Sequence, residues 1–352
     1  MKTLDLLLEK LYNTNNLTRE ELLYLLENLD QVHTEKLFEY ARKTRERYYG
    51  NKVYMRGLIE FSNICRMNCL YCGIRRDNKK VQRYRLSHRE ILECCREGYA
   101  LGYRTFVLQS GEDPWYTVER LTDIITDIKS MFPDVAVTLS AGERPEEEYR
   151  AFFEAGAERY LLRHETASRS LYESLHPGAS FDNRRNCLYI LKKIGYQVGA
   201  GFMVGLPGQT KEDLVEDLLF LKELEPHMIG IGPFIPHKET PLGSEKGGTV
   251  EDTLVMLALT RLLVPDCLLP ATTAMGTLHP EGRELALMAG ANVVMPNLSP
   301  TWARPKYELY QDKICTGDEA AHCRGCIERR INSVGMVVDM GRGDHCNFEH
   351  TA

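Results

Sequence analysis

The sequence lacks a long apolar run, and it holds only two tryptophans in 352 residues. No stretch approaches the roughly 18 consecutive apolar residues that a membrane-spanning helix needs. Asp5 and Glu9 interrupt the apolar beginning of the chain, so we do not expect a secretory signal. These absences predict a cytoplasmic protein with no membrane partner.

Positive charge is not in excess either, because 44 Lys and Arg stand against 50 Asp and Glu, for a formal net charge of −6. No basic run stands out, and nucleic-acid-binding domains usually carry one. We therefore expect no nucleic-acid partner. The sequence shows no internal repeat and no low-complexity tract, and 43% of its residues are hydrophobic, which is typical of a globular chain with a large core.

Cysteine is abundant, with 11 residues, and six of them fall in two tight groups. An odd number and uneven spacing do not suit a disulfide framework, and in a reducing cytoplasm such groups indicate metal. The first group is Cys65, Cys69 and Cys72, and the second is Cys315, Cys323 and Cys326. We expect four others to be small buried apolar residues, namely Cys94, Cys95, Cys187 and Cys267, and we leave Cys346 in the polar tail unassigned.

Short apolar runs alternate with amphipathic segments from residue 53 onward. Such alternation predicts parallel βαβ units and a complete (β/α)8 TIM-type barrel over residues 51–300. Residues 1–50 are expected to form an N-terminal helical cap, with a capping box at Thr18 and Glu21, and residues 301–352 a C-terminal extension. The expected strands lie at 53–61, 105–109, 135–140, 159–163, 197–204, 228–235, 268–274 and 291–296.

The first cysteine group supplies three thiolates within eight residues, directly after the first expected strand. Such a loop can bind three irons of a 4Fe-4S cluster and leave the fourth iron open. A structural zinc site normally closes with four ligands, and the nearest histidine, His88, is too distant for a compact local site. The spacing therefore favours the cluster over zinc.

With Tyr71 before the last cysteine, this arrangement resembles the radical S-adenosylmethionine (SAM) superfamily. The resemblance implies that the open iron binds SAM and that reduction of the cluster cleaves it to a 5′-deoxyadenosyl radical. Residues 110–112 and 199–210 resemble the family's segments near the SAM amino group and adenine. From the residue pattern alone, Arg163 and Glu165 could instead form a rim salt bridge, and Arg184 could lie on a solvated helix face. The implied SAM contacts are Tyr71, Gln109, Ser110, Gly111, Glu112, Thr138, Arg163, Glu165, Arg184 and Met203.

Longer segments narrow the resemblance to the radical SAM maturases of FeFe hydrogenase, the E-subunit family. They span residues 61–78, 107–114, 160–166, 204–210, 230–237 and 270–276. The resemblance implies an enzyme that acts, through the adenosyl radical, on a small anionic iron–carbonyl–cyanide–cysteine precursor of the di-iron subcluster. The implied partners are other hydrogenase maturases and a reductant such as a ferredoxin or flavodoxin.

The second cysteine group also resembles this family, which implies an auxiliary iron–sulfur cluster, 2Fe-2S or 4Fe-4S, at Cys315, Cys323 and Cys326. A zinc site completed by His322 is the alternative. The resemblance further implies substrate contacts in the barrel. Arg56 and Arg159 stand among apolar strand residues, where an uncompensated charge is costly, and this favours an anionic substrate unless they point outward to helices. The implied substrate residues are Arg56, Arg159, Thr272, Thr273, Tyr307 and Tyr310.

Three other functions stay open at this stage. One is a methylornithine synthase-like lysine mutase, a family that lacks a second triad. Another is a biotin-synthase-like sulfur inserter, which would need a further cluster inside the barrel. The last is a non-catalytic iron–sulfur scaffold, against which the arginine, glutamate and glycine motifs argue. The segment with Trp302, Pro305 and Lys306 departs from the maturase pattern.

Overall fold

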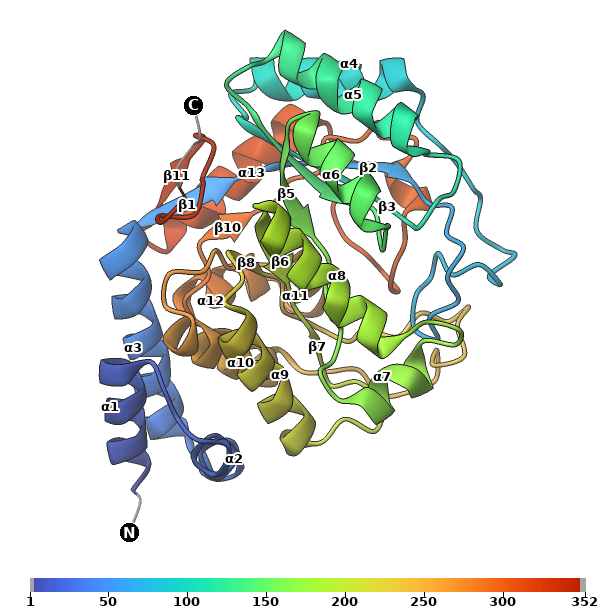
Figure 1. Cartoon of the computed structure of the whole chain (residues 1–352). Helices are drawn as coiled ribbons and strands as arrows, with labels where there is room; N and C mark the ends of the chain where they lie inside the picture. The colour runs from blue at the N-terminus through green and yellow to red at the C-terminus, as the bar shows by residue number, and fades with distance from the viewer. Residues whose placement is uncertain (1–2, 349–352) are drawn as a thin grey trace.

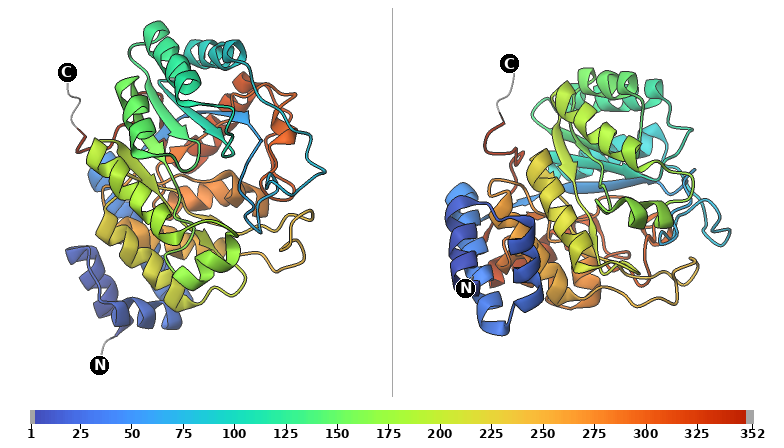
Figure 2. Two further views of the ribbon diagram at one scale, coloured as in Figure 1. Left: turned by 45° about the vertical axis from the view of Figure 1, so that its right-hand side comes forward. Right: turned by 60° about the horizontal axis from the view of Figure 1, so that its bottom comes forward.

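A computed structural model describes residues 3–348 of the chain (Figure 1). It begins with three helices, α1 (Leu4–Thr14), α2 (Arg19–Asn28) and α3 (Gln31–Tyr49). The predicted capping box is present, because the Thr18 side chain accepts from the Glu21 N–H and the Glu21 side chain accepts from the Thr18 N–H. The three helices lie at one side of the molecule, against α9 (Lys211–Leu224) and α10 (Val250–Leu263) (Figure 2).

A six-stranded parallel sheet forms the centre of the molecule, and its strands follow one another in chain order. Helices α4 (His88–Ala100), α5 (Val118–Met131), α6 (Glu146–Glu154), α8 (Phe181–Ile194) and α9 connect them. The strands are apolar along their length because helices cover one face and the interior covers the other. They are β2 (Gly57–Ser62), β3 (Thr105–Ser110), β4 (Ala136–Ser140), β5 (Ala157–Leu161), β6 (Gln197–Ala200) and β8 (Met228–Ile229).

Two smaller parallel sheets complete the strand inventory. One has the order β10 (Val293–Val294), β1 (Lys52–Met55) and β11 (Val337–Asp339), and the other pairs β7 (Met203–Val204) with β9 (Gly232–Pro233). Single parallel bridges join Met228 to Leu268 and Pro270 to Val293. The parallel α/β fold is confirmed, but within residues 3–348 the strands do not form one continuous closed sheet. The expected strand 228–235 is divided at residues 230–231 into β8 and β9, and Pro233 pairs with Val204 in β9.

The remaining elements follow the sheets or connect them. Helix α13 (Ala320–Ser333) leads through β11 into a tail that runs across the amino-terminal side of the central strands, where Asp344 accepts from Gln197 at 2.7 Å. This tail was not predicted as part of the core. None of the described helices is both long and apolar enough to cross a membrane. The remaining helices are α7 (Arg169–Leu175), α11 (Thr273–Leu278), α12 (Gly282–Met288) and a 3-10 turn (Arg304–Lys306).

Candidate active site

The first cysteine group lies on the loop that follows β2, at the carboxyl-terminal end of the central sheet. Burial raises the pKa of the Cys65 thiol, and burial together with the nearby Cys65 charge raises that of Cys69 to about 12. Burial and the two neighbouring thiols also raise the pKa of Cys72. Three half-buried thiols whose anions repel one another ionise readily only when a metal compensates their charge. The donor set therefore fits a 4Fe-4S cluster held by three thiolates.

Gly111 lets the loop after β3 approach this cysteine loop closely. A Cβ atom at Gly111 would lie 2.4 Å from the Ile64 carbonyl oxygen and 2.8 Å from the Cys65 Cβ. The neighbouring Glu112 N–H donates to the Cys65 sulfur at 3.4 Å. The glycine is required here because no side chain fits between the two backbones.

Tyr71, between two of the cysteines, is fixed by a histidine that the sequence did not indicate. The Tyr71 hydroxyl lies 2.8 Å from His176 Nε2, and His176 Nδ1 lies 2.7 Å from the Tyr172 carbonyl oxygen. Burial lowers the pKa of His176 to about 4, so the ring is neutral. A neutral ring that donates from Nδ1 accepts at Nε2, and Tyr71 is therefore the donor in that bond.

Arg184 lies in a cluster of carboxylates beside the cysteine loop. Its Nε is 2.6 Å from Glu143 Oε1 and its Nη2 is 4.0 Å from Glu112 Oε1. Burial disfavours the charged form, but Tyr172 and these carboxylates hold the pKa of Arg184 well above its usual value. A permanent guanidinium with fixed partners can bind a further carboxylate in two parallel hydrogen bonds.

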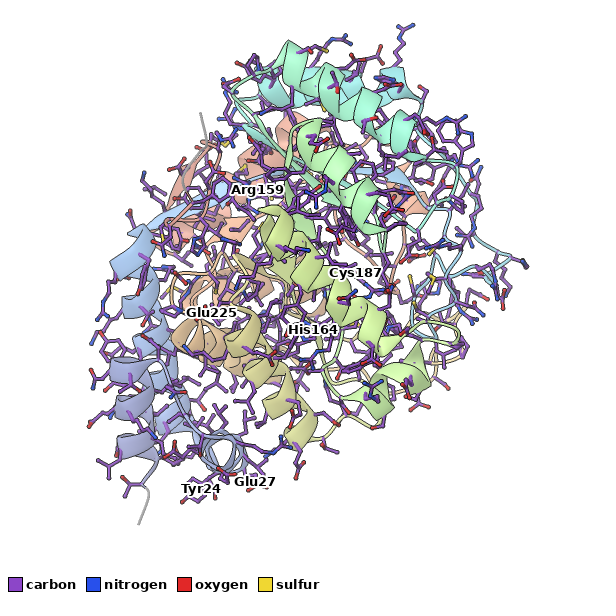
Figure 3. All side chains as sticks on the ribbon, in the orientation of Figure 1. Tyr24, Glu27, Arg159, His164, Cys187 and Glu225 are labelled. Atoms are coloured by element: carbon purple, nitrogen blue, oxygen red, sulfur yellow. The ribbon has the colours of Figure 1, made fainter. Side chains whose placement is uncertain are left out.

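Arg163 and Glu165 form the rim pair that the sequence allowed, with 3.3 Å between Nη2 and Oε2. Arg163 also donates to the Phe202 carbonyl oxygen at 2.8 Å. Glu165 has a φ of +67°, a conformation that is uncommon for a non-glycine residue and that often marks functional sites. Behind it, buried His164 lies 3.1 Å from Asp217 of α9 (Figure 3).

A cavity of about 330 Å³ extends from the cysteine loop across the carboxyl-terminal ends of the strands. Of the predicted SAM contacts, Tyr71, Gln109, Arg163, Glu165 and Met203 line it. The other five, Ser110, Gly111, Glu112, Thr138 and Arg184, do not. Glu112 and Arg184 lie beside the cysteine loop, whereas Thr138 is buried on β4, paired in register with Arg159, and its hydroxyl has no hydrogen-bond partner.

The same cavity reaches the second cysteine group, since Cys315 and Cys323 line it together with Cys69 and Cys72. Arg283 Nη1 and Nη2 lie 3.7 and 3.6 Å from the Cys315 sulfur. A hydrogen bond from Cys323 and the charge of Arg283 lower the pKa of Cys315 to about 5. Cys326 on α13 does not line the cavity. Thiols of the two groups therefore line one chamber.

Two predicted substrate residues lie away from this cavity. Arg159 is fully buried and reaches Asp344 Oδ1 at 2.6 Å, and Arg56 donates to the Gly343 carbonyl oxygen at 3.0 Å. Our argument that their charge needs an anionic substrate is wrong for Arg159, because the tail supplies the compensating carboxylate. Neither arginine lines the cavity.

The other predicted substrate residues are closer to the site. Thr272, Thr273 and Tyr310 line the cavity, and the buried Thr272 hydroxyl has no hydrogen-bond partner. Tyr307 does not line it, but its hydroxyl accepts from Gln109 at 3.4 Å. Three hydroxyl-bearing residues therefore face this space.

Several residues that line the cavity were not predicted from the sequence. Lys313 lies 2.5 Å from Glu60 Oε1, and Asn297 donates to Glu60 Oε2 at 2.8 Å. Glu60 falls within an apolar strand, and a charged residue in such a strand could have been predicted from the sequence as a site residue. Nothing in the sequence around Lys313 and Arg283 indicates a site, because only tertiary packing brings their segments to the strand ends.

The remaining cysteines have ordinary structural surroundings. Cys94, Cys95, Cys187 and Cys267 are buried, as predicted. Exposed Cys346 has its potential ligand atom within 4.8 Å of those of Asp266 and His345. Asn347 holds both of these, since its N–H donates to His345 Nδ1 and its amide to Asp266. These hydrogen bonds give the three residues a structural role, which is to attach the tail to the residues around Asp266.

Comparison with known proteins extends these observations. Residues 59–221 match the model of the radical SAM superfamily. The chain is 54% identical over 329 residues to the [FeFe] hydrogenase maturase subunit HydE of Thermotoga maritima, and the match covers 94% of each chain. The chain belongs to this maturase family. It is a radical SAM enzyme of FeFe-hydrogenase maturation, as the resemblance implied.

Members of this family have relatives of different function. The 3-methylornithine synthase of Methanosarcina acetivorans is 32% identical, over 83% of this chain and 82% of that protein. The crystal structure of methylornithine synthase (PylB) superposes with a TM-score of 0.83 at 29% identity, over 95% of this chain and 97% of that one. The maturase and the synthase thus share a fold, so substrate identity depends on the cavity residues.

Proposed function

We propose that this maturase acts on a small anionic iron–carbonyl–cyanide–cysteine complex inside the cavity, and that it holds both a SAM-cleaving 4Fe-4S cluster and an auxiliary iron–sulfur cluster. The proposal is supported above all by one observation. Thiols of both cysteine groups line the cavity, together with Arg163, Arg283 and Lys313. Arg163 and Lys313 pair with Glu165 and Glu60, which also line it, so Arg283 beside Cys315 is the cation left for a ligand. A chamber with this lining suits a small, anionic, thiophilic ligand.

A 4Fe-4S cluster would be held by Cys65, Cys69 and Cys72, and when bound and reduced it would supply the electron for cleavage of SAM to a 5′-deoxyadenosyl radical. The chain's own residues bind and orient SAM. Arg184 would pair with the SAM carboxylate, while Glu112 and Glu165 would accept hydrogen bonds from its ammonium or ribose. Tyr71, whose hydroxyl is held by His176, would help to orient SAM in the cavity. The enclosed lining would exclude water that would otherwise quench a radical.

The substrate would lie further along the cavity, toward the second cysteine group. The unpartnered Thr272 hydroxyl, Thr273 and Tyr310 would donate hydrogen bonds to it, and Arg283 would compensate its charge. Because Arg159 is paired with Asp344, we assign no substrate contact to it in this arrangement. The auxiliary cluster, 2Fe-2S or 4Fe-4S, would be held by Cys315, Cys323 and Cys326.

We further propose that the strands complete a (β/α)8 barrel. The single bridges at Met228–Leu268 and Pro270–Val293 support this, as does the continuity of β1 with β2. Residues 1–50 would form the cap, 51–300 the barrel and 301–352 the extension. The enzyme would work in the cytoplasm with other maturases and a ferredoxin or flavodoxin.

The test is anaerobic reconstitution of the protein with iron and sulfide, followed by dithionite and SAM. We expect 5′-deoxyadenosine from the wild type and none from Cys69→Ala. Addition of the iron–carbonyl–cyanide–cysteine complex should raise the rate of SAM cleavage and restore hydrogenase activity to an extract that lacks this maturase. Formation of 5′-deoxyadenosine without any response to the complex would overturn the substrate assignment.

A lysine mutase is the second candidate, because the 32% identity to 3-methylornithine synthase covers most of both chains. Incubation of the same holoenzyme with L-lysine separates the two functions. Formation of methylornithine, with no rescue of the hydrogenase extract, would favour the mutase. We expect the opposite result, because L-lysine carries two ammonium groups and one carboxylate, and a net cation gains nothing from Arg283 in the cavity.

A further inference from the structure

The loop that bears the first cysteine group also carries a local excess of positive charge. Residues 66–85 hold seven Lys and Arg and a single acid, Asp77, in a chain whose net charge is −6. The excess is easily overlooked in the sequence because cysteines and apolar residues separate the charges. Arg76 and Lys80 are strongly exposed, with 59% and 74% of their side-chain surface accessible.

Not all of this charge is free. Arg83 is a structural residue, because its guanidinium donates to the carbonyl oxygens of Asn63, Ile74, Arg75 and Asn78. Arg66 pairs with Glu112 and Arg85 with Asp113. Lys79 is exposed. Arg76 pairs with Asp77 at 3.0 Å and Lys80 with Glu239 at 2.7 Å. The positive charge of the outward face therefore comes mainly from Lys79 and half-buried Arg75, with exposed Lys238 beside them.

Beside this face lies a hollow of about 480 Å³, separate from the active-site cavity. Lys80, Lys238 and Lys306 contribute to its lining, together with Glu239 and Glu308. The cysteine loop and the segment around residue 238 project from the same side of the molecule (Figure 2).

The segment that departs from the maturase pattern forms one wall of the hollow. Trp302 is 45% exposed there, and the Lys306 ammonium lies 4.7 Å from the centre of its ring. Tryptophan is enriched at protein interfaces. This segment therefore has a structural feature that the SAM chemistry does not explain.

The floor of the hollow touches the residue that follows Cys72. A Cβ on Gly73 would lie 2.1 Å from the Glu308 carbonyl oxygen and 2.7 Å from a ring carbon of His237. His237 and Glu308 both line the hollow. A molecule seated there would be separated from a ligand of the first cluster by a single layer of residues.

We propose that this hollow and the basic loop dock an acidic one-electron donor protein that reduces the first cluster. The proposal rests on the proposed function, because only a SAM-cleaving cluster needs such a donor. One electron leaves the donor and enters the cluster bound by Cys65, Cys69 and Cys72, with no bond made or broken. Charge complementarity would steer the donor to the face nearest the cluster.

The test uses the reconstituted holoenzyme and a reduced flavodoxin, an acidic protein, as the limiting reductant. We expect Lys79→Glu/Lys238→Glu to raise the KM for flavodoxin about tenfold in 5′-deoxyadenosine formation, because two attractive charges become repulsive. Trp302→Ala should raise the same KM. With dithionite as the reductant, every variant should match the wild type. The matched control is Lys193→Glu at the far end of α8, an exposed charge reversal that should leave the flavodoxin KM unchanged.

Raised salt should weaken the wild-type reaction with flavodoxin and have little effect on the double variant, because ions screen exposed charges within about 10 Å at 0.1 M. Equal flavodoxin KM values in the wild type and the double variant would overturn the docking site. Equal loss with both reductants would also overturn it, because the lysines would then act on the cluster loop itself. Failure of the wild type to cleave SAM with dithionite would instead overturn the proposed function.

Discussion

Gly111 shows how a single missing side chain sets the position of the cysteine loop. We predict that Gly111→Ala folds but loses more than half of its cluster iron, because the added methyl must displace the Ile64 carbonyl and Cys65. Iron per chain after reconstitution, together with circular dichroism, measures the two effects. Gly230→Ala is the control, since it lies outside both cysteine groups and a Cβ there meets no atom closer than 3.9 Å. Full iron loading of Gly111→Ala would show that the loop can shift without cost.

His176 acts on the site through Tyr71 and is neutral in the fold. Because burial lowers its pKa from 6.5 to about 4, the folded chain binds fewer protons than the unfolded chain below pH 6.5. The effect of His176 on the free energy of unfolding is therefore absent above pH 6.5. As the pH falls from 6.5 toward 4, it lowers the free energy of unfolding by up to about 1.4 kcal/mol per pH unit.

We predict that His176→Gln flattens this dependence in urea unfolding of the cluster-free protein between pH 7 and 4.5. The glutamine can still accept from Tyr71, so the KM for SAM should change little, whereas His176→Ala should raise it. His279→Gln, at an exposed histidine, should leave the pH dependence as in the wild type. Parallel curves for His176→Gln and wild type would mean that His176 is not the group that titrates.

At the scale of elements, the tail after β11 replaces the ligand that we had expected beside Arg159. Burial opposes ionisation of Asp344, but Arg159 and Arg342 hold its pKa well below the usual range. We predict that Asp344→Asn lowers the free energy of unfolding by about 3 kcal/mol, because it leaves a buried guanidinium without its carboxylate. Urea unfolding of the cluster-free protein measures this.

A second variant separates the ion pair from general damage to the tail. Arg159→Met combined with Asp344→Asn should recover part of the loss, because the uncompensated charge is gone. If the double variant were as unstable as the sum of the two single variants, Asp344 would stabilise the tail through Gln197 and Arg342 rather than through Arg159.

These elements also show which parts of the fold and the site could be predicted from the sequence. The parallel strands, the connecting helices and the cap at Thr18 followed from periodicity and capping, which are local properties. The partner of Arg159 did not, because Asp344 is 185 residues away and nothing local marks it as core. The same holds for Arg283 and Lys313, which tertiary packing alone brings to the cavity. The cluster site of the first cysteine group, in contrast, could be predicted, because its three cysteines lie in one short loop and their spacing is a local property.

At the scale of the whole molecule, both cysteine groups contribute thiols to the lining of one cavity rather than lying at unrelated sites. The first group lies beside Arg184 and Glu112, the residues suited to SAM. The second lies beside Arg283 and the hydroxyl residues, the side suited to the substrate. SAM cleavage should therefore depend on the first group alone, while turnover of the precursor should depend on both.

We predict that Cys323→Ala lowers the iron content by about two or about four atoms per chain, according to whether the second site holds 2Fe-2S or 4Fe-4S. Formation of 5′-deoxyadenosine with dithionite should stay within about twofold of the wild type, because independent sites usually have additive effects. Cys65→Ala should abolish it. Cys94→Ser, at a buried cysteine outside both groups, controls for nonspecific loss of iron. A Cys323→Ala protein that binds the full complement of iron would show that the second group holds no cluster, and Arg283 would then face a free thiolate.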